Sequence, residues 1–106
     1  MSDLAPTEAA ERLRDGWQLL DVRVEHERHE DGVIAGDVHI PLTELSARAG
    51  EIDPDRPVLV YCHTGSRSAM AVAALRGAGY DAWNLAGGIV AWGERGLPIG
   101  RPAGDR

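Results

Sequence analysis

Short apolar runs alternate with helical patterns along most of this chain, and this alternation limits the possible folds more than any other feature of the sequence. Each run is bounded by glycine, proline or charged residues, as short buried strands usually are. The runs lie around Leu4 and at residues 17–23, 38–40, 58–61 and 80–85. Strands that alternate with helices pair in parallel, and the helices cover both faces of the sheet. We therefore predict an α/β fold with a mostly parallel sheet.

The intervening segments have helical spacing. The predicted helices cover residues 6–15, 43–49, 66–78 and 89–95. Thr7 and Thr43 are the expected N-caps of the first two helices, because a threonine hydroxyl can accept a hydrogen bond from a free backbone N–H. Met70 is expected to pack with its alanine-rich helix against the sheet. The charged run at 25–31 is interpreted as a solvent-exposed helical turn.

The length of 106 residues suits one domain with one hydrophobic core. We place the domain at residues 1–99, and the glycine, proline and charge of residues 100–106 predict a flexible tail. A single cysteine cannot form an internal disulfide and excludes zinc sites that need several cysteines. No apolar run has the length of a membrane span, and no basic segment followed by an apolar one opens the chain. These features predict a cytoplasmic protein without a membrane partner.

The charged residues argue against several classes of function. The formal net charge is −6 and every basic residue is an arginine, which argues against nucleic-acid binding. The absence of lysine excludes a Schiff-base lysine and the lysine of a nucleotide-binding phosphate loop. We therefore expect no nucleotide-dependent phosphoryl transfer, and we predict no cofactor.

The lone cysteine, Cys62, stands where the predicted strand at 58–61 ends and shortly before the predicted helix at 66–78. Free backbone N–H groups and the helix dipole favour negative charge at such a position, and a thiol there can have a pKa of about 3.5 to 7.5 instead of about 8.5. A buried structural thiol is the alternative, since free cysteine often packs as a small apolar residue. The neighbouring glycine, hydroxyls and arginine favour a reactive thiolate.

The same loop has the features of an anion-binding site. Gly65 lets backbone N–H groups converge on one point, and Arg67 can add a charged donor. Asp21 ends another predicted strand. Because the carboxyl ends of parallel strands meet at one edge of a sheet, we expect Asp21 and Cys62 to lie on the same rim. The residues therefore predict a small oxyanion pocket that presents a thiolate to its ligand.

Four blocks of the sequence, in their order and spacing, resemble the single-domain rhodaneses, or thiosulfate sulfurtransferases. They lie at residues 20–23, 36–42, 60–68 and 84–92. Rhodanese loops typically read Cys-Arg-any-Gly-any-Arg, and the same positions here run from Cys62 to Arg67. The resemblance covers nearly the whole chain. It implies a rhodanese-like three-layer α/β/α domain with a five-stranded, mostly parallel sheet.

The resemblance also implies a reaction. Cys62 would attack the outer sulfur of thiosulfate, sulfite would leave, and the Cys62 persulfide would pass its sulfur to cyanide or a thiol. Thiosulfate and such an acceptor would be the small-molecule partners, and a sulfur-relay protein could be a further partner. Asp21 would support the loop through Arg23 or Arg67. The loop residues implied to hold the anion and the persulfide are His63, Thr64, Gly65, Ser66, Arg67 and Ser68.

Three departures from the family pattern affect these expectations. Residues 32–37 lack the histidine and proline of the family's Gly-His-Ile-Pro-Gly-Ala segment, so we expect a looser turn. His63 occupies the position of the usual loop arginine and carries little charge at neutral pH, so we expect a modest affinity for thiosulfate. Some larger rhodaneses place an extra arginine after the Asp21 strand, and Arg28 is the only candidate for it here.

Other functions are open at this point. Cysteine phosphatases and arsenate reductases share the anion-binding loop, but they place five residues between cysteine and arginine, whereas four separate Cys62 from Arg67. A non-catalytic rhodanese-like sulfur-carrier or binding module could use the charged run at 25–31 to dock a cationic partner. His26 and His29 could share a helical face as metal ligands, but we prefer the solvated-face interpretation and predict no metal.

Overall fold

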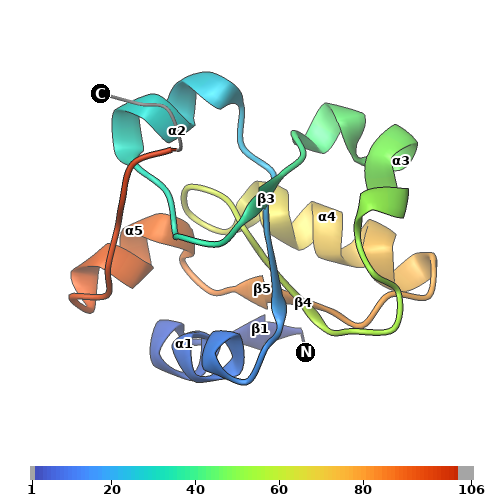
Figure 1. The fold of residues 1–106 in the computed structure, drawn as a ribbon, viewed down its shortest axis with the longest axis horizontal. Coiled ribbons are helices and arrows are strands. Elements are labelled where there is room, and N and C mark those ends of the chain that lie inside the picture. Colours follow the sequence, from blue (N-terminus) through green and yellow to red (C-terminus); the bar gives the residue numbers. More distant parts are fainter. Residues whose placement is uncertain (1, 103–106) are drawn as a thin grey trace.

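The computed structural model describes residues 2–102 and contains a five-stranded parallel sheet, as predicted. The strands are β1 (Asp3–Leu4), β2 (Gln18–Asp21), β3 (Val38–His39), β4 (Val58–Tyr61) and β5 (Ala82–Leu85). Their order across the sheet is β1-β5-β4-β2-β3, so β4 lies at the centre (Figure 1). Every neighbouring pair is parallel, which places the carboxyl ends of the strands at one edge of the sheet.

Helices cover both faces of this sheet. The α-helices within residues 2–102 are α1 (Pro6–Arg14), α2 (Glu25–Asp31), α3 (Leu45–Arg48), α4 (Ser66–Gly77) and α5 (Gly88–Glu94), and all but α2 lie on a face. Helices α1 and α5 pack on one face, and α3 and α4 pack on the other, which gives the three-layer α/β/α arrangement (Figure 1). Helix α2 lies beyond the end of β2, at the carboxyl edge of the sheet (Figure 1).

The central strand β4 links the two apolar clusters of the core. All of its residues are buried, and successive side chains point to opposite faces. Val58 and Val60 belong to the cluster under α3 and α4, whereas Leu59 and Tyr61 belong to the cluster under α1 and α5. Asp21, at the end of β2, is in register with Tyr61. The two strand ends therefore bring Asp21 and the loop that follows Tyr61 to the same edge.

Neither predicted threonine cap forms in the structure. Helix α1 follows Ala5 and begins at Pro6, whose fixed φ and missing N–H suit the first helical turn. Thr43 lies inside a 3-10 turn (Leu42–Glu44) that leads into α3, and a second 3-10 turn (Ala49–Glu51) follows α3. The single helix predicted at 43–49 is therefore a series of three short turns.

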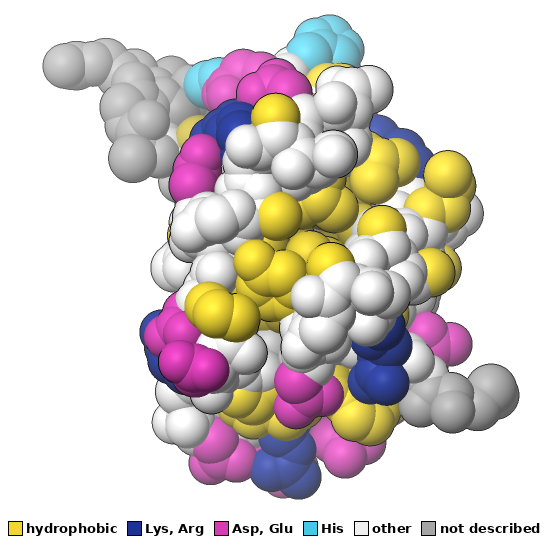
Figure 2. All heavy atoms as spheres, turned by 90° about the vertical axis from the view of Figure 1, so that its right-hand side faces the viewer, with side chains coloured by type: hydrophobic (Ala, Val, Ile, Leu, Met, Phe, Trp, Pro, Cys, Tyr) yellow, Lys and Arg dark blue, Asp and Glu magenta, His cyan; other side chains and the backbone are white. Residues whose placement is uncertain are grey.

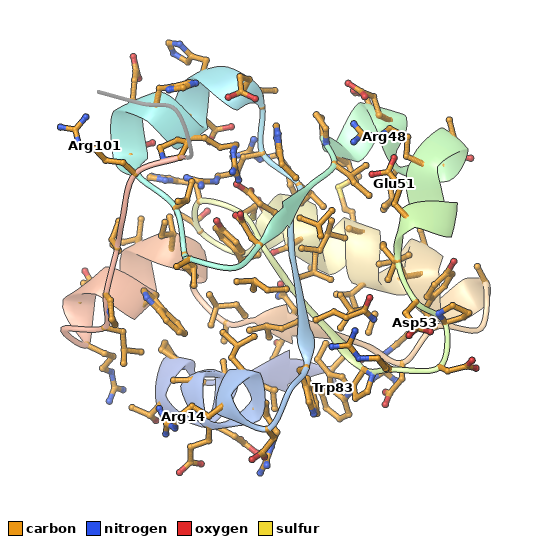
Figure 3. All side chains as sticks on the ribbon, viewed as in Figure 1. Arg14, Arg48, Glu51, Asp53, Trp83 and Arg101 are labelled. Atoms are coloured by element: carbon orange, nitrogen blue, oxygen red, sulfur yellow. The ribbon has the colours of Figure 1, made fainter. Side chains whose placement is uncertain are left out.

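Exposed ion pairs connect these short turns. Arg48 donates hydrogen bonds to Glu51 at 2.8 Å and to Glu44 at 2.9 Å, and these exposed pairs hold the short turns together (Figure 3).

Met70, on the neighbouring α4, is 64% exposed, so the prediction that it packs on the sheet is wrong. Met70 falls outside the single helical stripe that α4 buries. That stripe consists of Ser68, Ala71, Val72 and Leu75.

Two apolar grooves lie between the helices. One has a volume of about 300 Å³ and lies between the α3 region and α4, on a face where hydrophobic side chains gather (Figure 2). The other has a volume of about 340 Å³ and lies between α1, α5 and residues 97–100. Residues of the loop after β4 line neither groove, so the candidate site lies elsewhere.

The C-terminal segment pairs with the turn after α2. Val33 and Gly100 form an antiparallel bridge with N···O distances of 3.0 and 2.8 Å. A Cβ at Gly32 would lie 2.8 Å from the carbonyl oxygen of Gly100, so the close approach requires a glycine. Gly100 thus belongs to the folded domain and not to the predicted flexible tail, and residues 103–106 lie outside the described residues. Within residues 2–102, no helix is long and apolar enough to span a membrane.

Candidate active site

The loop after β4 turns at Gly65 and leads directly into α4. Gly65 has a φ of 105°, and a Cβ there would lie 3.2 Å from the backbone nitrogen of Gly87. Glycine is the residue that adopts this conformation without strain. Cys62 stands at the start of the loop, is 1% exposed, and directs its sulfur at the first turn of α4. The junction of strand and helix is therefore the one that the sequence predicts.

Three hydrogen-bond donors lie between 3.1 and 3.3 Å from the sulfur of Cys62. The backbone nitrogens of Gly65 and Ser68 lie 3.1 and 3.3 Å from Sγ, and the Ser68 hydroxyl lies 3.2 Å from it. Burial is the largest influence on the Cys62 pKa and raises it. Hydrogen bonds from the Ser68 hydroxyl and from the amides of Ser68, Gly65 and Arg67 outweigh burial, so the net shift of the Cys62 pKa is downward. The surroundings of the sulfur therefore favour the thiolate.

The Ser68 hydroxyl has a second partner, Oδ1 of Asn84 on β5, at 2.6 Å. A hydroxyl carries one proton and can donate to only one of these partners at a time. While Cys62 is a thiol, its S–H can donate to Ser68 Oγ and the hydroxyl can donate to Asn84. When Cys62 ionises, the same hydroxyl can turn toward the thiolate. Ser68 thus supplies a donor that can follow the charge of the sulfur.

Asn84 belongs to the site although it is not among the predicted residues. It is 5% exposed, and its Nδ2 donates to the carbonyl oxygen of Gly65 at 3.3 Å and to Asp3 Oδ1 at 3.1 Å. The side chain therefore connects β5 and β1 to the turn of the loop. An amide inside an apolar strand is the signal in the sequence that could identify it, since a buried amide needs hydrogen-bond partners.

Arg67 is paired across the loop with Glu27 of α2. Its Nη1 and Nη2 donate to the two carboxylate oxygens of Glu27, at 2.6 and 2.8 Å. These hydrogen bonds are the largest cause of the shift of the Glu27 pKa down to about 2, and they also raise the pKa of Arg67. Arg23 and Arg67 are the two predicted partners of Asp21. Within the described residues, Asp21 forms an ion pair with Arg23, whereas Arg67 pairs with Glu27.

The interpretation of residues 25–31 as a solvated helical turn is wrong for two of its side chains. Because α2 lies over the carboxyl edge of the sheet, Glu27 reaches the loop after β4 and the Arg28 side chain is only 11% exposed. Arg28 forms ion pairs with the buried carboxylates of Asp21 and Asp37. Its guanidinium therefore does not serve as the extra anion-binding arginine of larger rhodaneses. His26 and His29 are the exposed members of the run that pair with acidic residues of the same helix.

Asp21 lies at the centre of a buried ionic network. Arg23 donates to it from Nε at 3.0 Å and from Nη2 at 2.9 Å, and Arg28 donates from Nη1 at 2.8 Å. Arg28 also donates to Asp37 at 2.8 Å, and the Tyr61 hydroxyl donates to Asp37 at 2.6 Å. The network therefore reaches the end of β4, one residue before the cysteine, and makes no direct contact with the sulfur.

The same network holds the turn at 33–37. The backbone N–H of Ile34 donates to the Tyr61 hydroxyl at 3.1 Å, and that hydroxyl in turn donates to Asp37. Burial is the main cause that raises the Tyr61 pKa, and the charge of Asp21 and the hydrogen bond to Asp37 act in the same direction. Asp37 and the bridge to Gly100 therefore tie this turn to the rest of the domain.

His63, Thr64 and Ser66 lie on the outer side of the loop. Thr64 and Ser66 are exposed, and the His63 side chain is 42% exposed with its Nδ1 at 3.8 Å from Asp31 Oδ2. His63, Asp31 and Glu27 could each offer one ligand atom to a metal within 4.8 Å of one another. Glu27 already forms an ion pair, so this group is a poor candidate for a resident metal.

Comparisons with known proteins agree with this fold and this loop. The chain matches the rhodanese-like domain over residues 5–95. It is 40% identical over 98 residues to a sulfurtransferase of Allochromatium vinosum, covering 90% of this chain and 91% of that protein. It is 35% identical over 89 residues to the thiosulfate sulfurtransferase GlpE of Pseudomonas syringae pv. syringae, covering 82% of this chain and 83% of the relative.

The solved structures show the same relationship. The crystal structure of a rhodanese-related protein from Thermoplasma volcanium has a TM-score of 0.87 and 31% sequence identity, and the match covers 93% of this chain and 97% of that one. The parallel sheet, the cysteine at the end of its central strand and the relatives lead to the same conclusion. This chain belongs to the rhodanese-like family.

Proposed function

We propose that this protein is a sulfurtransferase that moves sulfane sulfur from thiosulfate, or another sulfur donor, to cyanide or a thiol through a persulfide on Cys62. The observation that supports this most strongly is the buried Cys62 sulfur with donors at 3.1, 3.2 and 3.3 Å. A thiolate stabilised in this way is both a nucleophile and a good leaving group. The relatives named as sulfurtransferases support the same chemistry.

The proposed reaction has two half-reactions. In the first, the Cys62 thiolate attacks the outer sulfur of thiosulfate, a new sulfur–sulfur bond forms, and sulfite leaves with the electron pair of the broken bond. In the second, the acceptor attacks the terminal sulfur of the persulfide, and the Cys62 thiolate leaves with the electron pair. The protein returns to its starting state, as ping-pong nucleophilic catalysis requires.

The residues of the loop have separate roles in this proposal. The backbone N–H groups of residues 63–68 would bind the anion and then the persulfide, and those of Gly65 and Ser68 already point at the Cys62 sulfur. The Ser68 hydroxyl would stabilise whichever sulfur carries the negative charge. Asp21 and Arg23 would act indirectly, by holding the ends of β2 and β4 in register. A sulfur-relay protein is included in the proposal as a donor or an acceptor.

Two alternatives make different predictions about the persulfide. A phosphatase-type enzyme would not form it, and the loop favours sulfur transfer because only four residues separate Cys62 from Arg67, which makes a smaller pocket. A non-catalytic sulfur-carrier or binding module could form a persulfide but would not release its sulfur to small acceptors.

Intact-mass spectrometry after incubation with thiosulfate tests the proposal. We expect the wild-type protein to gain the mass of one sulfur atom, and to lose it with formation of thiocyanate when cyanide is added. The Cys62→Ser variant should gain nothing. An adduct that no small acceptor removes would indicate a carrier, and hydrolysis of an aryl phosphate without any sulfur adduct would indicate a phosphatase.

A further inference from the structure

The ion pair between Arg67 and Glu27 occupies the donors that an anionic ligand would need. Arg67 is the only arginine in the segment 62–68. Its Nη1 and Nη2 both point to the Glu27 carboxylate, at 2.6 and 2.8 Å. A guanidinium binds carboxylates and other oxyanions through the same planar pair of N–H groups. Glu27 therefore stands where an oxyanion bound to Arg67 would have to place its oxygens.

The Glu27 carboxylate is fixed in this position and stays charged. Its side chain is 19% exposed, and its Oε1 also accepts a hydrogen bond from the backbone nitrogen of Val24 at 3.3 Å. The hydrogen bonds from Arg67 lower the Glu27 pKa to about 2, so the carboxylate is ionised at every pH at which a thiolate enzyme works. Asp31 adds a second carboxylate near the loop, 3.8 Å from His63. The surroundings of the loop therefore carry more negative charge than the loop sequence alone suggests.

We propose that Glu27 is a specificity-determining residue that competes with anionic sulfur donors for Arg67. The site then selects against free dianions such as thiosulfate and favours sulfane sulfur carried on an uncharged group. The choice of sulfur donor rests on the function proposed above, whereas the competition for Arg67 does not. Glu27 acts through Arg67 and has no contact with the reacting sulfur, so it is a positioning residue for the guanidinium.

Alkylation of Cys62 by a matched pair of reagents tests the competition without any sulfur transfer. Iodoacetate is an anion and iodoacetamide is its neutral analogue, and the ratio of their rates cancels any change in the fraction of thiolate. We expect the Glu27→Gln variant to raise the rate ratio of iodoacetate to iodoacetamide by about fivefold to tenfold, because Arg67 is released to bind the anion. Glutamine keeps an oxygen that can accept the hydrogen bond from Val24.

Glu30 provides the matched control on the same helix. It is an exposed glutamate that pairs with His26, and Glu30→Gln makes the same change of charge without touching Arg67. We expect its rate ratio to stay within about twofold of the wild type. In the Arg67→Ala background, Glu27→Gln should also change the ratio by less than about twofold. Equal increases in Glu27→Gln and Glu30→Gln, or an unchanged ratio in Glu27→Gln, would overturn the proposal.

Two further measurements separate this inference from the proposed function. With thiosulfate as the donor, Glu27→Gln should lower KM more than it changes kcat, whereas Glu27→Asp, which keeps the charge, should stay closer to the wild type. If the alkylation ratio rises but no persulfide forms, the proposed function fails and the competition for Arg67 stands. If thiosulfate loads Cys62 while the ratio does not change, the proposed function stands and the role of Glu27 is refuted.

Discussion

The reactivity of this site depends on how the charge of one buried sulfur is stabilised. Cys62 is 1% exposed, so without donors its burial would favour the neutral thiol. The backbone amides of the loop supply part of the compensation, and they are present whatever the side chains are. The Ser68 hydroxyl supplies the rest, and it is the donor that a single substitution can remove.

Replacing Ser68 with alanine is expected to raise the pKa of Cys62. The Ser68 hydroxyl is the largest of the hydrogen bonds that lower this pKa, and Ser68→Ala leaves the backbone N–H in place. The midpoint of the pH profile for alkylation by iodoacetamide should therefore move to higher pH. The rate at neutral pH should fall by roughly threefold to tenfold.

Ser66→Ala is the control for this prediction. Ser66 lies on the same turn of α4, but it is exposed and is not among the donors to the sulfur. Its alkylation profile should match that of the wild type. If both variants shift the midpoint equally, the Ser68 hydroxyl has no special part in stabilising the thiolate.

The start of α5 and the loop that carries Cys62 are packed backbone against backbone. The N–H of Ile89 donates to the carbonyl oxygen of Cys62 at 3.0 Å, and the N–H of Val90 donates to that of His63 at 3.2 Å. Gly88 lies between these elements with a φ of 64°, and a Cβ there would overlap the His63 carbonyl. The first turn of α5 therefore helps to set the position of the loop.

Gly88→Ala is expected to lower the free energy of unfolding by about 2–3 kcal/mol, because it combines a left-handed backbone with a steric overlap. Urea denaturation measures the change. Gly77→Ala is the comparison, since a Cβ at Gly77 meets nothing within 4 Å and Gly77 lies in helix α4. It should be neutral or stabilise the protein by up to about 1 kcal/mol. Equal effects of the two substitutions would contradict the packing argument.

Across the whole molecule, one buried ionic network joins elements that are distant in sequence. It connects Asp21 at the end of β2, Arg28 on α2, Asp37 in the turn before β3 and Tyr61 at the end of β4. Removing one partner of a buried ion pair leaves a charge without compensation, which costs far more than the pair contributes when it is intact. The network therefore makes the edge of the sheet sensitive to single substitutions.

Arg28→Ala is expected to lower the free energy of unfolding by about 3 kcal/mol, because among residues 2–102 it leaves Asp37 with only the Tyr61 hydroxyl and Asp21 with only one of its two arginines. Arg12→Ala is the exposed counterpart. Arg12 pairs with Asp15 at 2.8 Å on the surface of α1, so its loss should cost less than about 1 kcal/mol. Denaturation curves of equal midpoint for the two variants would show that the network is not stabilising.

The sequence by itself determined the strand–helix alternation and the place of the reactive residue. Short apolar runs with turn residues between them predict parallel strands. The prediction is confirmed for β4, whose four consecutive apolar residues are buried on both faces of the sheet. The cysteine, Gly65 and the start of α4 follow from local backbone rules, which depend on neighbours in the chain. The family resemblance rests on the same local blocks.

Only the tertiary structure decided the partners of the charged and polar side chains. The run at 25–31 has the composition of a solvent-exposed helix. Nothing in that composition predicts that α2 lies over the carboxyl edge of the sheet (Figure 1). Glu27 therefore meets Arg67 forty positions away, and Asn84 meets Ser68 sixteen positions away. Such contacts depend on how whole elements pack, whereas hydrophobic spacing records only which face of an element is buried.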